Sequence, residues 1–133
     1  MAFPGLTLYG SQGSRSPLVS WYLHELNVPF RTISPRDLLQ TIVSKPNPHP
    51  FGQIPFLEDD GFGVFESGAI LTYLADKYGH LDTPQKRAAV GMWCMWANSS
   101  LDPVCFVENE RGQVLGTKAD KENPKLRRLD AIL

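Results

Sequence analysis

The sequence predicts a mixed α/β domain in residues 1–80, followed by a partial all-α region in residues 83–133. Strand-type and helix-type patterns alternate in the first part, in the order βαβ and then ββα. A βαβ unit places two strands in parallel, and a hairpin adds an antiparallel pair. We therefore expect a mixed four-stranded sheet with helices packed on it, and no strand after Thr83.

The βαβ unit is indicated by a short apolar run, a helix with start and stop signals, and an alternating run. Leu6–Tyr9 is typical of a strand, and Gly10 closes it. The pair Ser16-Pro17 is a strong helix start, because serine caps a helix and proline fits its first position. Asn27 can end this helix in a left-handed conformation, and residues 29–34 alternate like a second strand.

The ββα unit is indicated by a turn signal between two short apolar runs. Residues 55–58 and 63–65 flank Asp59-Asp60-Gly61, which favours a tight turn. Ser67 can cap the following helix, and Gly79 is its natural end. The hairpin and helix complete the first domain.

Helix signals dominate the second region. Thr83-Pro84 repeats the combination of cap and proline, and residues 88–97 continue the helix. Pro103 must kink or restart it, and Asn123-Pro124 opens a last helix. About fifty residues in a few helices cannot enclose a core alone. We expect them to pack on the first domain, on a partner or on further sequence.

Composition is that of a soluble globular protein. The 133 residues are 42% hydrophobic and 20% charged, with a net charge of −1. This charge gives no electrostatic footprint for nucleic acid or an anionic membrane, and no stretch approaches the roughly 20 apolar residues of a membrane span. Met1–Gly5 lacks the features of a secretory signal, and two cysteines are no disulfide framework. A cytoplasmic protein is expected.

Three motifs together resemble the glutathione S-transferase family. They are Leu8-Tyr9-Gly10 before a serine-containing loop, the run from Asn47-Pro48 through Phe51-Gly52-Gln53-Ile54-Pro55 to Glu58, and Glu66-Ser67 with Ala69-Ile70. The resemblance covers residues 6–79. It implies a thioredoxin-like, glutathione-binding domain in residues 1–80, of a serine-type class that is theta- or phi-like or similar to bacterial and cyanobacterial members. Residues 83–133 would then be the truncated start of the helical C-terminal domain.

The resemblance implies that two segments hold glutathione as co-substrate. In the family, the bond between Ile54 and Pro55 is cis, which turns the backbone N–H and C=O of Ile54 toward an extended peptide. Gln53 bridges to the same peptide. Ser67 and the free N–H groups of a helix start suit a carboxylate, and Glu66 suits the ammonium beside it.

Simpler interpretations of these residues exist. Pro55 can merely start a strand, and Ser67 can merely cap a helix. Arg15, Lys45 and His49 are candidates for binding the glycine carboxylate of glutathione, although single basic residues in loops are usually just solvated.

Catalysis requires a thiolate, and the donor that stabilises it belongs in the loop before the first helix. A thiol with a pKa of about 8.5 is only slightly ionised at neutral pH, and lowering that pKa by about two units takes roughly 2.7 kcal/mol. A hydroxyl donor and a helix N-terminus can supply this. Alignment with serine-type transferases favours Ser14. Arg15 is a second candidate, Tyr9 a third, and Ser11 and Ser16 are neighbours, with Ser16 expected to be the N-cap.

The functional hypothesis is a glutathione transferase acting in detoxification, as a homodimer, on a small hydrophobic electrophile or a peroxide. Phe51 resembles an aromatic dimer contact of the family. The alternative is a non-catalytic binding or dimerisation module, like that of elongation factor gamma subunits. A glutathione-dependent thiol oxidoreductase is disfavoured, because residues 10–17 hold no cysteine for a mixed disulfide. The three histidines lack metal-ligand spacing, so no metal site is expected.

Overall fold

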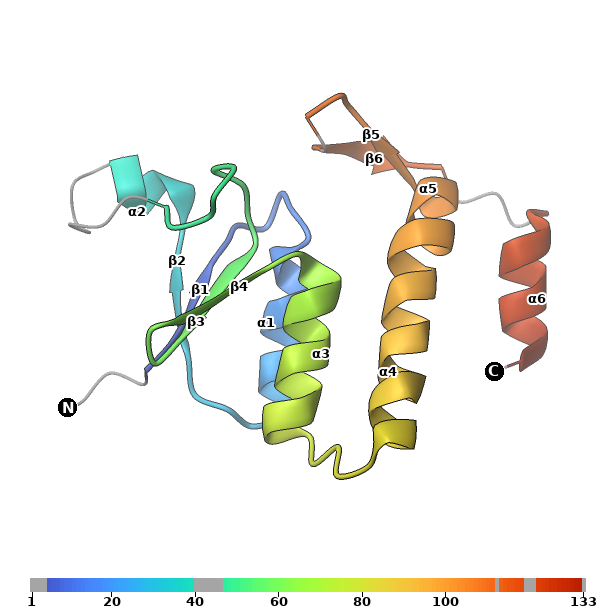
Figure 1. Cartoon of the computed structure of the whole chain (residues 1–133). Coiled ribbons are helices and arrows are strands. Elements are labelled where there is room, and N and C mark those ends of the chain that lie inside the picture. Colours follow the sequence, from blue (N-terminus) through green and yellow to red (C-terminus); the bar gives the residue numbers. More distant parts are fainter. Residues whose placement is uncertain (1–4, 40–46, 112, 119–121, 133) are drawn as a thin grey trace.

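Residues 5–39, 47–111, 113–118 and 122–132 are described by the structure, a computed structural model. The first part of the chain forms a four-stranded sheet with the strand order β2-β1-β3-β4 (Figure 1). Its strands are β1 (Leu6–Tyr9), β2 (Arg31–Ile33), β3 (Phe56–Asp59) and β4 (Phe62–Phe65). β1 is parallel to β2 and antiparallel to β3, and β3 is antiparallel to β4. The predicted mixed sheet is confirmed.

Alternation of side chains gives this sheet two different faces. Leu8 of β1 lies opposite Leu57 of β3, and both pack against α1 (Ser16–Glu25) and α3 (Ser67–Tyr78). The same core contains Leu6, Val19, Leu23, Ile70 and Leu74. A second cluster consists of Tyr9, Ile33 and Phe56. The short helix α2 (Pro35–Leu39) follows β2 and lies away from α1 and α3 (Figure 1).

A two-residue turn, Asp60-Gly61, joins β3 to β4. The two residues have φ values of 48° and 85°, which are left-handed values typical of a type I′ turn. Glycine adopts such a φ without steric cost, and aspartate tolerates it. The predicted hairpin is confirmed, with Asp59 as the last residue of β3 rather than part of the turn.

Asp59 fixes the C-terminal half of α3 to the end of β3. Its side chain is only 2% exposed, and one carboxylate oxygen, Oδ2, accepts hydrogen bonds from three groups of α3. The donors are the Tyr73 hydroxyl at 2.8 Å, the Lys77 ammonium at 2.6 Å and the Tyr78 hydroxyl at 2.9 Å. A buried charge is tolerated because it is paired and hydrogen-bonded in this way.

The starts of α1 and α3 differ from the prediction by one residue. Arg15 and Glu66 occupy the cap positions, and neither makes a side-chain capping hydrogen bond. Ser16 and Ser67 are the first helical residues, and both are buried. The prediction that these two serines are N-caps is therefore wrong. For Ser16 the physical reason is that its hydroxyl bonds to the loop before α1.

The helix ends follow the prediction more closely. Asn27, just beyond α1, has a φ of 53°, which confirms the left-handed residue expected there. Gly79 follows the last residue of α3, but its φ is −96°, and the left-handed residue is His80 with a φ of 58°.

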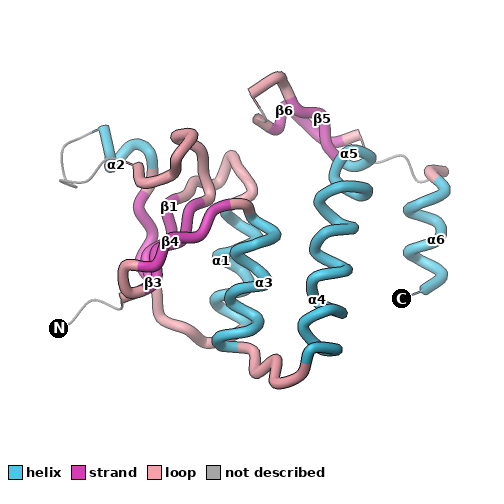
Figure 2. Tube along the Cα trace, in the orientation of Figure 1, coloured by secondary structure: helices cyan, strands magenta, loops and turns pink. Residues whose placement is uncertain are grey.

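Residues 84–132 are mainly helical, as expected, but also contain a β-hairpin. The elements are α4 (Pro84–Trp96), a π-helical turn (Ala97–Leu101), α5 (Asp102–Cys105), β5 (Phe106–Glu108), β6 (Val114–Thr117) and α6 (Pro124–Ile132). The expectation that no strand follows Thr83 is therefore wrong, because β5 and β6 pair antiparallel as a sheet of their own. Figure 2 shows this hairpin standing apart from the first sheet.

The second region packs on the first domain through α3 and α4. In Figure 1, α4 and α5 lie along one rod beside α3, with the π-helical turn between them and Pro103 in the first turn of α5. The start of α3 approaches this rod closely, since a Cβ atom on Gly68 would lie only 2.5 Å from Nδ2 of Asn98. A larger residue at this position would require the Asn98 side chain to move.

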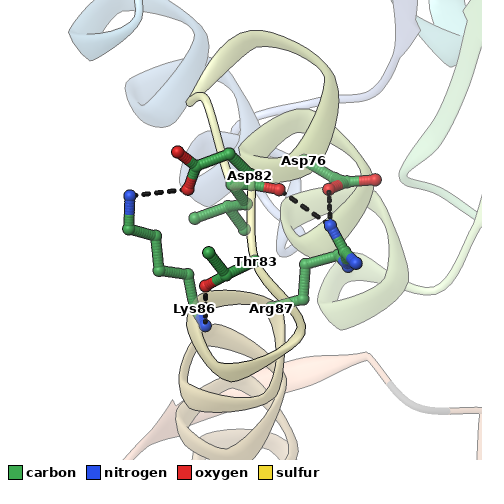
Figure 3. A network of polar contacts seen from close by, with 6 residues as sticks. Asp76, Asp82, Thr83, Lys86 and Arg87 are labelled. Atoms are coloured by element: carbon green, nitrogen blue, oxygen red, sulfur yellow. Dashed lines mark hydrogen bonds and ion pairs between the residues drawn. The ribbon is translucent and has the colours of Figure 1, made fainter.

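Polar contacts organise the link between α3 and α4 (Figure 3). Oγ1 of Thr83 accepts the N–H of Lys86 at 3.2 Å and so caps α4, as predicted. The Lys86 ammonium pairs with Asp82 at 2.6 Å. Arg87 donates to the carbonyl of Leu81 at 2.9 Å. All of these contacts are exposed, and exposed ion pairs add little stability, so the cap is the main local contribution.

Replacing Thr83 by alanine is expected to lower the free energy of unfolding by about 1 kcal/mol, because the first turn of α4 loses the acceptor for the Lys86 N–H. Urea unfolding measures this change. Thr83→Ser is the control, since it keeps the hydroxyl and should stay close to the wild type. Equal losses in both variants would show that the cap contributes nothing.

Candidate functional site

A cavity of about 620 Å³ lies where β1 leads into α1 and β4 leads into α3. We call it the cradle cavity. Residues from both parts of the chain line it. The first domain contributes residues from the loop 11–15, Pro35, residues from the segment 47–55 and the start of α3, and the second region contributes residues of the β5–β6 hairpin. Eight predicted site residues, which are far apart in the sequence, line this cavity together: Ser14, Arg15, His49, Gln53, Ile54, Pro55, Glu66 and Ser67.

The segment 53–55 offers backbone groups to the cavity. The Ile54–Pro55 peptide bond is cis. Ile54 packs its side chain against the second cluster of the sheet, and within the described residues its backbone N–H and C=O make no backbone hydrogen bond. The side-chain amide of Asn47 donates to the carbonyl of Gln53 at 3.0 Å, which holds this segment against the preceding loop. An extended peptide can pair with free backbone groups of this kind.

The start of α3 offers an anion site. Ser67 is 4% exposed and lines the cavity as the first residue of the helix. The first N–H groups of a helix have no intrahelical acceptor, and the helix dipole favours negative charge there. Glu66, directly before the helix, has a φ of 71° and a ψ of 121°. A non-glycine residue in this region carries backbone strain, which concentrates at functional sites.

The three serines before α1 form a closed ring of hydrogen bonds. The Ser11 N–H donates to Oγ of Ser16 at 3.3 Å, the hydroxyls of Ser16 and Ser14 lie 2.6 Å apart, and the Ser14 hydroxyl donates to the Ser11 carbonyl at 2.9 Å. The Ser16 N–H also donates to Oγ of Ser14 at 3.1 Å. A Cβ on Gly10 would lie 2.3 Å from Oγ of Ser16, so the glycine after β1 makes room for the ring.

The ring polarises the Ser14 hydroxyl. Ser14 accepts hydrogen bonds from Ser16, and such bonds polarise a hydroxyl and strengthen the bond it donates. Ser14 lines the cavity just before the start of α1.

Arg15 is engaged in ion pairs across the two parts of the chain. Its guanidinium lies 3.0 Å from Asp102 and also contacts Glu108 of β5. Burial raises the pKa of the Asp102 carboxyl, Arg15 lowers it, and Glu108 raises it further, so that the pKa is raised in sum. Since two carboxylates already neutralise it, Arg15 serves the contact between the hairpin and the loop before α1.

Two further candidates for the glycine end of the ligand were His49 and Lys45. His49 is buried, lines the cavity, and accepts the Phe51 N–H at Nδ1 at 3.0 Å. Its ring lies 4.9 Å from that of Phe65. The second nitrogen is therefore the one left for a ligand. Lys45 lies outside the described residues.

Tyr9 is not brought to the cavity. It is 2% exposed, packs edge-on against Phe56 with ring centroids 5.9 Å apart, and is absent from the cavity lining. Burial raises the pKa of its hydroxyl; Glu58 raises it further and Arg31 lowers it. Side chains alternate between the two faces of the sheet along β1, and Tyr9 lies on the face of the second cluster, where it packs with Ile33 and Phe56. Among the predicted thiol activators, the geometry favours Ser14.

The hairpin residues on the cavity lining were missed by the sequence reasoning. They are Glu108, Arg111, Gln113 and Val114. The available signal was two β-type runs, residues 106–108 and 114–117, around a short glycine-containing segment. Trp93 and Trp96, by contrast, line a separate groove with α6, of about 420 Å³.

In the described part of the chain, no three His, Cys, Asp or Glu side chains are grouped to hold a metal ion. None of its helices has the length and apolar character needed to cross a membrane.

The fold defines a thioredoxin-like domain followed by a helical region, with the cradle cavity lined by residues of both. Residues 8–85 match the family model "Glutathione S-transferase, N-terminal domain". The chain belongs to the glutathione S-transferase family.

Several known proteins are similar to this chain. Glutathione S-transferase 3 of Schizosaccharomyces pombe is 29% identical over 114 residues, which are 78% of this chain and 46% of that protein. The theta class glutathione S-transferase of Xanthomonas axonopodis pv. citri, solved with glutathione bound, has a TM-score of 0.60 and 26% identity, covering 77% of this chain and 52% of that one. Elongation factor 1-gamma of Sus scrofa is 42% identical over 55 residues, which are 41% of this chain and 13% of that protein. The chain thus spans about half the length of these transferases.

Proposed function

We propose that the protein binds glutathione in the cradle cavity and activates its thiol for attack on an electrophile or a peroxide. The observation that carries the proposal is that one cavity gathers Ser14, the segment 53–55 and the start of α3. Each supplies a group that a different part of the tripeptide needs. The structural relative from Xanthomonas axonopodis pv. citri, which has glutathione bound, supports the same ligand.

The ligand would lie across the cavity in a defined direction. A γ-glutamyl group carries an ammonium and a carboxylate on one carbon, which suits Glu66 and the helix start at Ser67. The free backbone groups of Ile54 would pair with the central cysteinyl residue, with Gln53 beside it. The glycine carboxylate would lie toward His49.

The thiol would then lie at Ser14. The Ser14 hydroxyl would turn its proton from the Ser11 carbonyl to the sulfur, and the N-terminus of α1 would add a favourable dipole. The thiolate attacks an electrophilic carbon, and the leaving group departs with the bonding pair. The thiol proton passes to solvent.

Further parts of the proposal concern assembly and context. We propose a homodimer, supported by Phe51, whose side chain is 76% exposed in the loop beside the cavity. Such an exposed aromatic residue is a suitable interface contact. A cytoplasmic role in detoxification of small hydrophobic electrophiles is proposed with it.

A second candidate function is a non-catalytic binding or dimerisation module. It is favoured by the similarity to elongation factor 1-gamma. This module would share the cavity, so thiol ionisation, rather than glutathione binding, separates the two functions. A thiol oxidoreductase is disfavoured by the serines in residues 10–17, where that chemistry needs a cysteine.

Replacing Ser67 by alanine is expected to weaken glutathione binding about tenfold, because a hydrogen bond to a charged carboxylate is lost. Isothermal titration calorimetry measures the dissociation constant. Ser99→Ala is the matched control, since Ser99 is exposed, bonds to the Met95 carbonyl and is not part of the cavity lining. Absence of glutathione binding by the wild-type chain would overturn the proposed function.

A further inference from the structure

The β5–β6 hairpin forms one wall of the cradle cavity. Glu108, Arg111, Gln113 and Val114 all line it. In Figure 1 the turn of the hairpin extends from the top of α5 toward the side of the first domain. A ligand held by the segment 53–55 and the start of α3 would therefore lie in the same cavity as the lining residues of this hairpin.

The hairpin is held at the thiol end of the cavity. Glu108 of β5 and Asp102 of α5 both pair with Arg15. Arg15 is the direct neighbour of Ser14, whose hydroxyl is proposed to donate a hydrogen bond to the glutathione sulfur. The candidates for the glycine end, His49 and Lys45, belong to a different segment. The hairpin thus stands beside the position where an electrophile meets the sulfur.

The turn that carries Arg111 is braced from within. Oδ1 of Asn109 accepts the N–H groups of Arg111 and Gln113, both at 2.9 Å. Nδ2 of Asn109 donates to Oε1 of Gln113 at 2.7 Å, and the Asn109 N–H donates to the Gln113 carbonyl at 3.0 Å. These bonds fix the backbone at Arg111, so its side chain starts from a defined position.

The two arginines on the cavity lining differ in their partners. Arg15 is paired with two carboxylates. Arg111 has no ion pair within the described ranges of the chain, and its side chain is exposed. A guanidinium binds carboxylates in a planar, two-point geometry. The unmatched positive charge on this wall is therefore at Arg111.

We propose that Arg111 makes the cavity selective for acidic electrophiles, meaning electrophiles that carry a carboxylate. This rests on the proposed function, because it concerns the second substrate of the same site. A model substrate is 4-chloro-3,5-dinitrobenzoate. The glutathione sulfur forms a bond to the carbon that bears chlorine, the carbon–chlorine bond breaks, and chloride leaves with the bonding pair. Arg111 pairs with the carboxylate on the opposite side of the ring.

The test uses the conjugate of glutathione with this substrate, so that it does not depend on turnover. The two probes are S-(4-carboxy-2,6-dinitrophenyl)glutathione and the same conjugate with a neutral carboxamide in place of the carboxyl. Calorimetry gives the dissociation constants of both and of free glutathione. We expect the wild type to bind the acid about five- to tenfold more tightly than the amide, a modest factor because the side chain is exposed.

Two variants of Arg111 test whether this side chain causes the preference for the acid conjugate over the amide. Arg111→Met should remove the preference for the acid, and Arg111→Lys should keep part of it, with free glutathione bound as by the wild type. Lys118→Met is the matched control: it removes one positive charge beside the same hairpin but outside the cavity lining, and should keep the preference.

The outcomes separate this inference from the function on which it rests. Equal binding of acid and amide by the wild type, with glutathione still bound, overturns the role of Arg111 alone. Weaker binding of free glutathione by Arg111→Met also overturns it, since Arg111 would then hold glutathione itself. Loss of the preference in Lys118→Met would overturn it as a general charge effect. No binding of glutathione by the wild type overturns both proposals.

Discussion

Replacing Asp59 by asparagine is expected to lower the free energy of unfolding by about 2–3 kcal/mol, although the side chain keeps its size. The buried carboxylate accepts from Tyr73, Lys77 and Tyr78 at a single oxygen. A neutral amide oxygen is a weaker acceptor for all three donors, and the Lys77 ammonium loses its partner. The loss stays below that of a fully buried ion pair because the Lys77 side chain is 40% exposed and can reach water.

The effect of Asp59→Asn should depend on pH. Burial by itself raises the pKa of Asp59, but the hydrogen bonds from Lys77, Tyr73 and Tyr78 together lower it. A lowered carboxyl pKa contributes stability that is present above the unfolded value of about 3.9 and is lost as the pH falls through the folded value. The hydrogen bond to Asp59 raises the pKa of Lys77. That contribution is present below about pH 10.4 and is lost as the pH rises through the raised value.

Urea unfolding of the wild type and Asp59→Asn, from acidic to neutral pH, measures the difference in their free energies of unfolding. This difference should be largest near neutral pH and should become smaller below about pH 4. Asp60→Asn is the matched control, because the same chemical change then occurs in the exposed turn next to Asp59. Equal stabilities of the two variants at neutral pH would show that the carboxylate does not anchor α3.

Replacing Ser14 by alanine is expected to raise the pKa of the thiol of bound glutathione by about one unit and to lower the thiolate-dependent rate about tenfold at pH values below that pKa. The hydroxyl that would donate to the sulfur is lost, and the helix N-terminus alone remains. The ultraviolet absorbance of the thiolate in the complex, recorded against pH, gives the pKa without any second substrate.

The serine ring supplies a close control for this measurement. Ser11 takes part through its backbone N–H and C=O, so Ser11→Ala keeps the ring and should leave the thiol pKa unchanged. Tyr9→Phe should also leave it unchanged, since Tyr9 lies in the core. An unchanged thiol pKa in Ser14→Ala, or a larger rise in Arg15→Met, would contradict the role of Ser14.

The first domain could be predicted from the sequence because its signals are local. The short β-type run Leu6–Tyr9, the turn signal Asp59-Asp60-Gly61 and the proline after Ser16 each depend on a few neighbouring residues, and the structure contains the elements they predict. The eight predicted residues of the cradle cavity were found through the resemblance to a family, because strand order rather than local sequence pattern brings them together.

The features that could not be predicted from the sequence depend on contacts between residues that are far apart in the chain or on the packing of side chains. Ser16 carries every mark of an N-cap, but its hydroxyl is taken by Ser11 and Ser14, and the cap position falls on Arg15. The pairing of Arg15 with Glu108 spans 93 residues and needs a hairpin that short β-type runs indicate only weakly. Tyr9 could be separated from Ser14 only when the faces of β1 were assigned.

The hydrogen-bond ring around Ser14 has a fixed direction, because the Ser11 amide can only donate and the Ser11 carbonyl can only accept. The orientation of both hydroxyls is thus set by the main chain. The proposed donation to a bound thiolate would then require one rotation about the Cβ–Oγ bond of Ser14, and no proton of this hydroxyl would have to be exchanged with water. Side-chain rotations of this kind take picoseconds to nanoseconds, so reorientation of the Ser14 hydroxyl should not delay ionisation of the thiol.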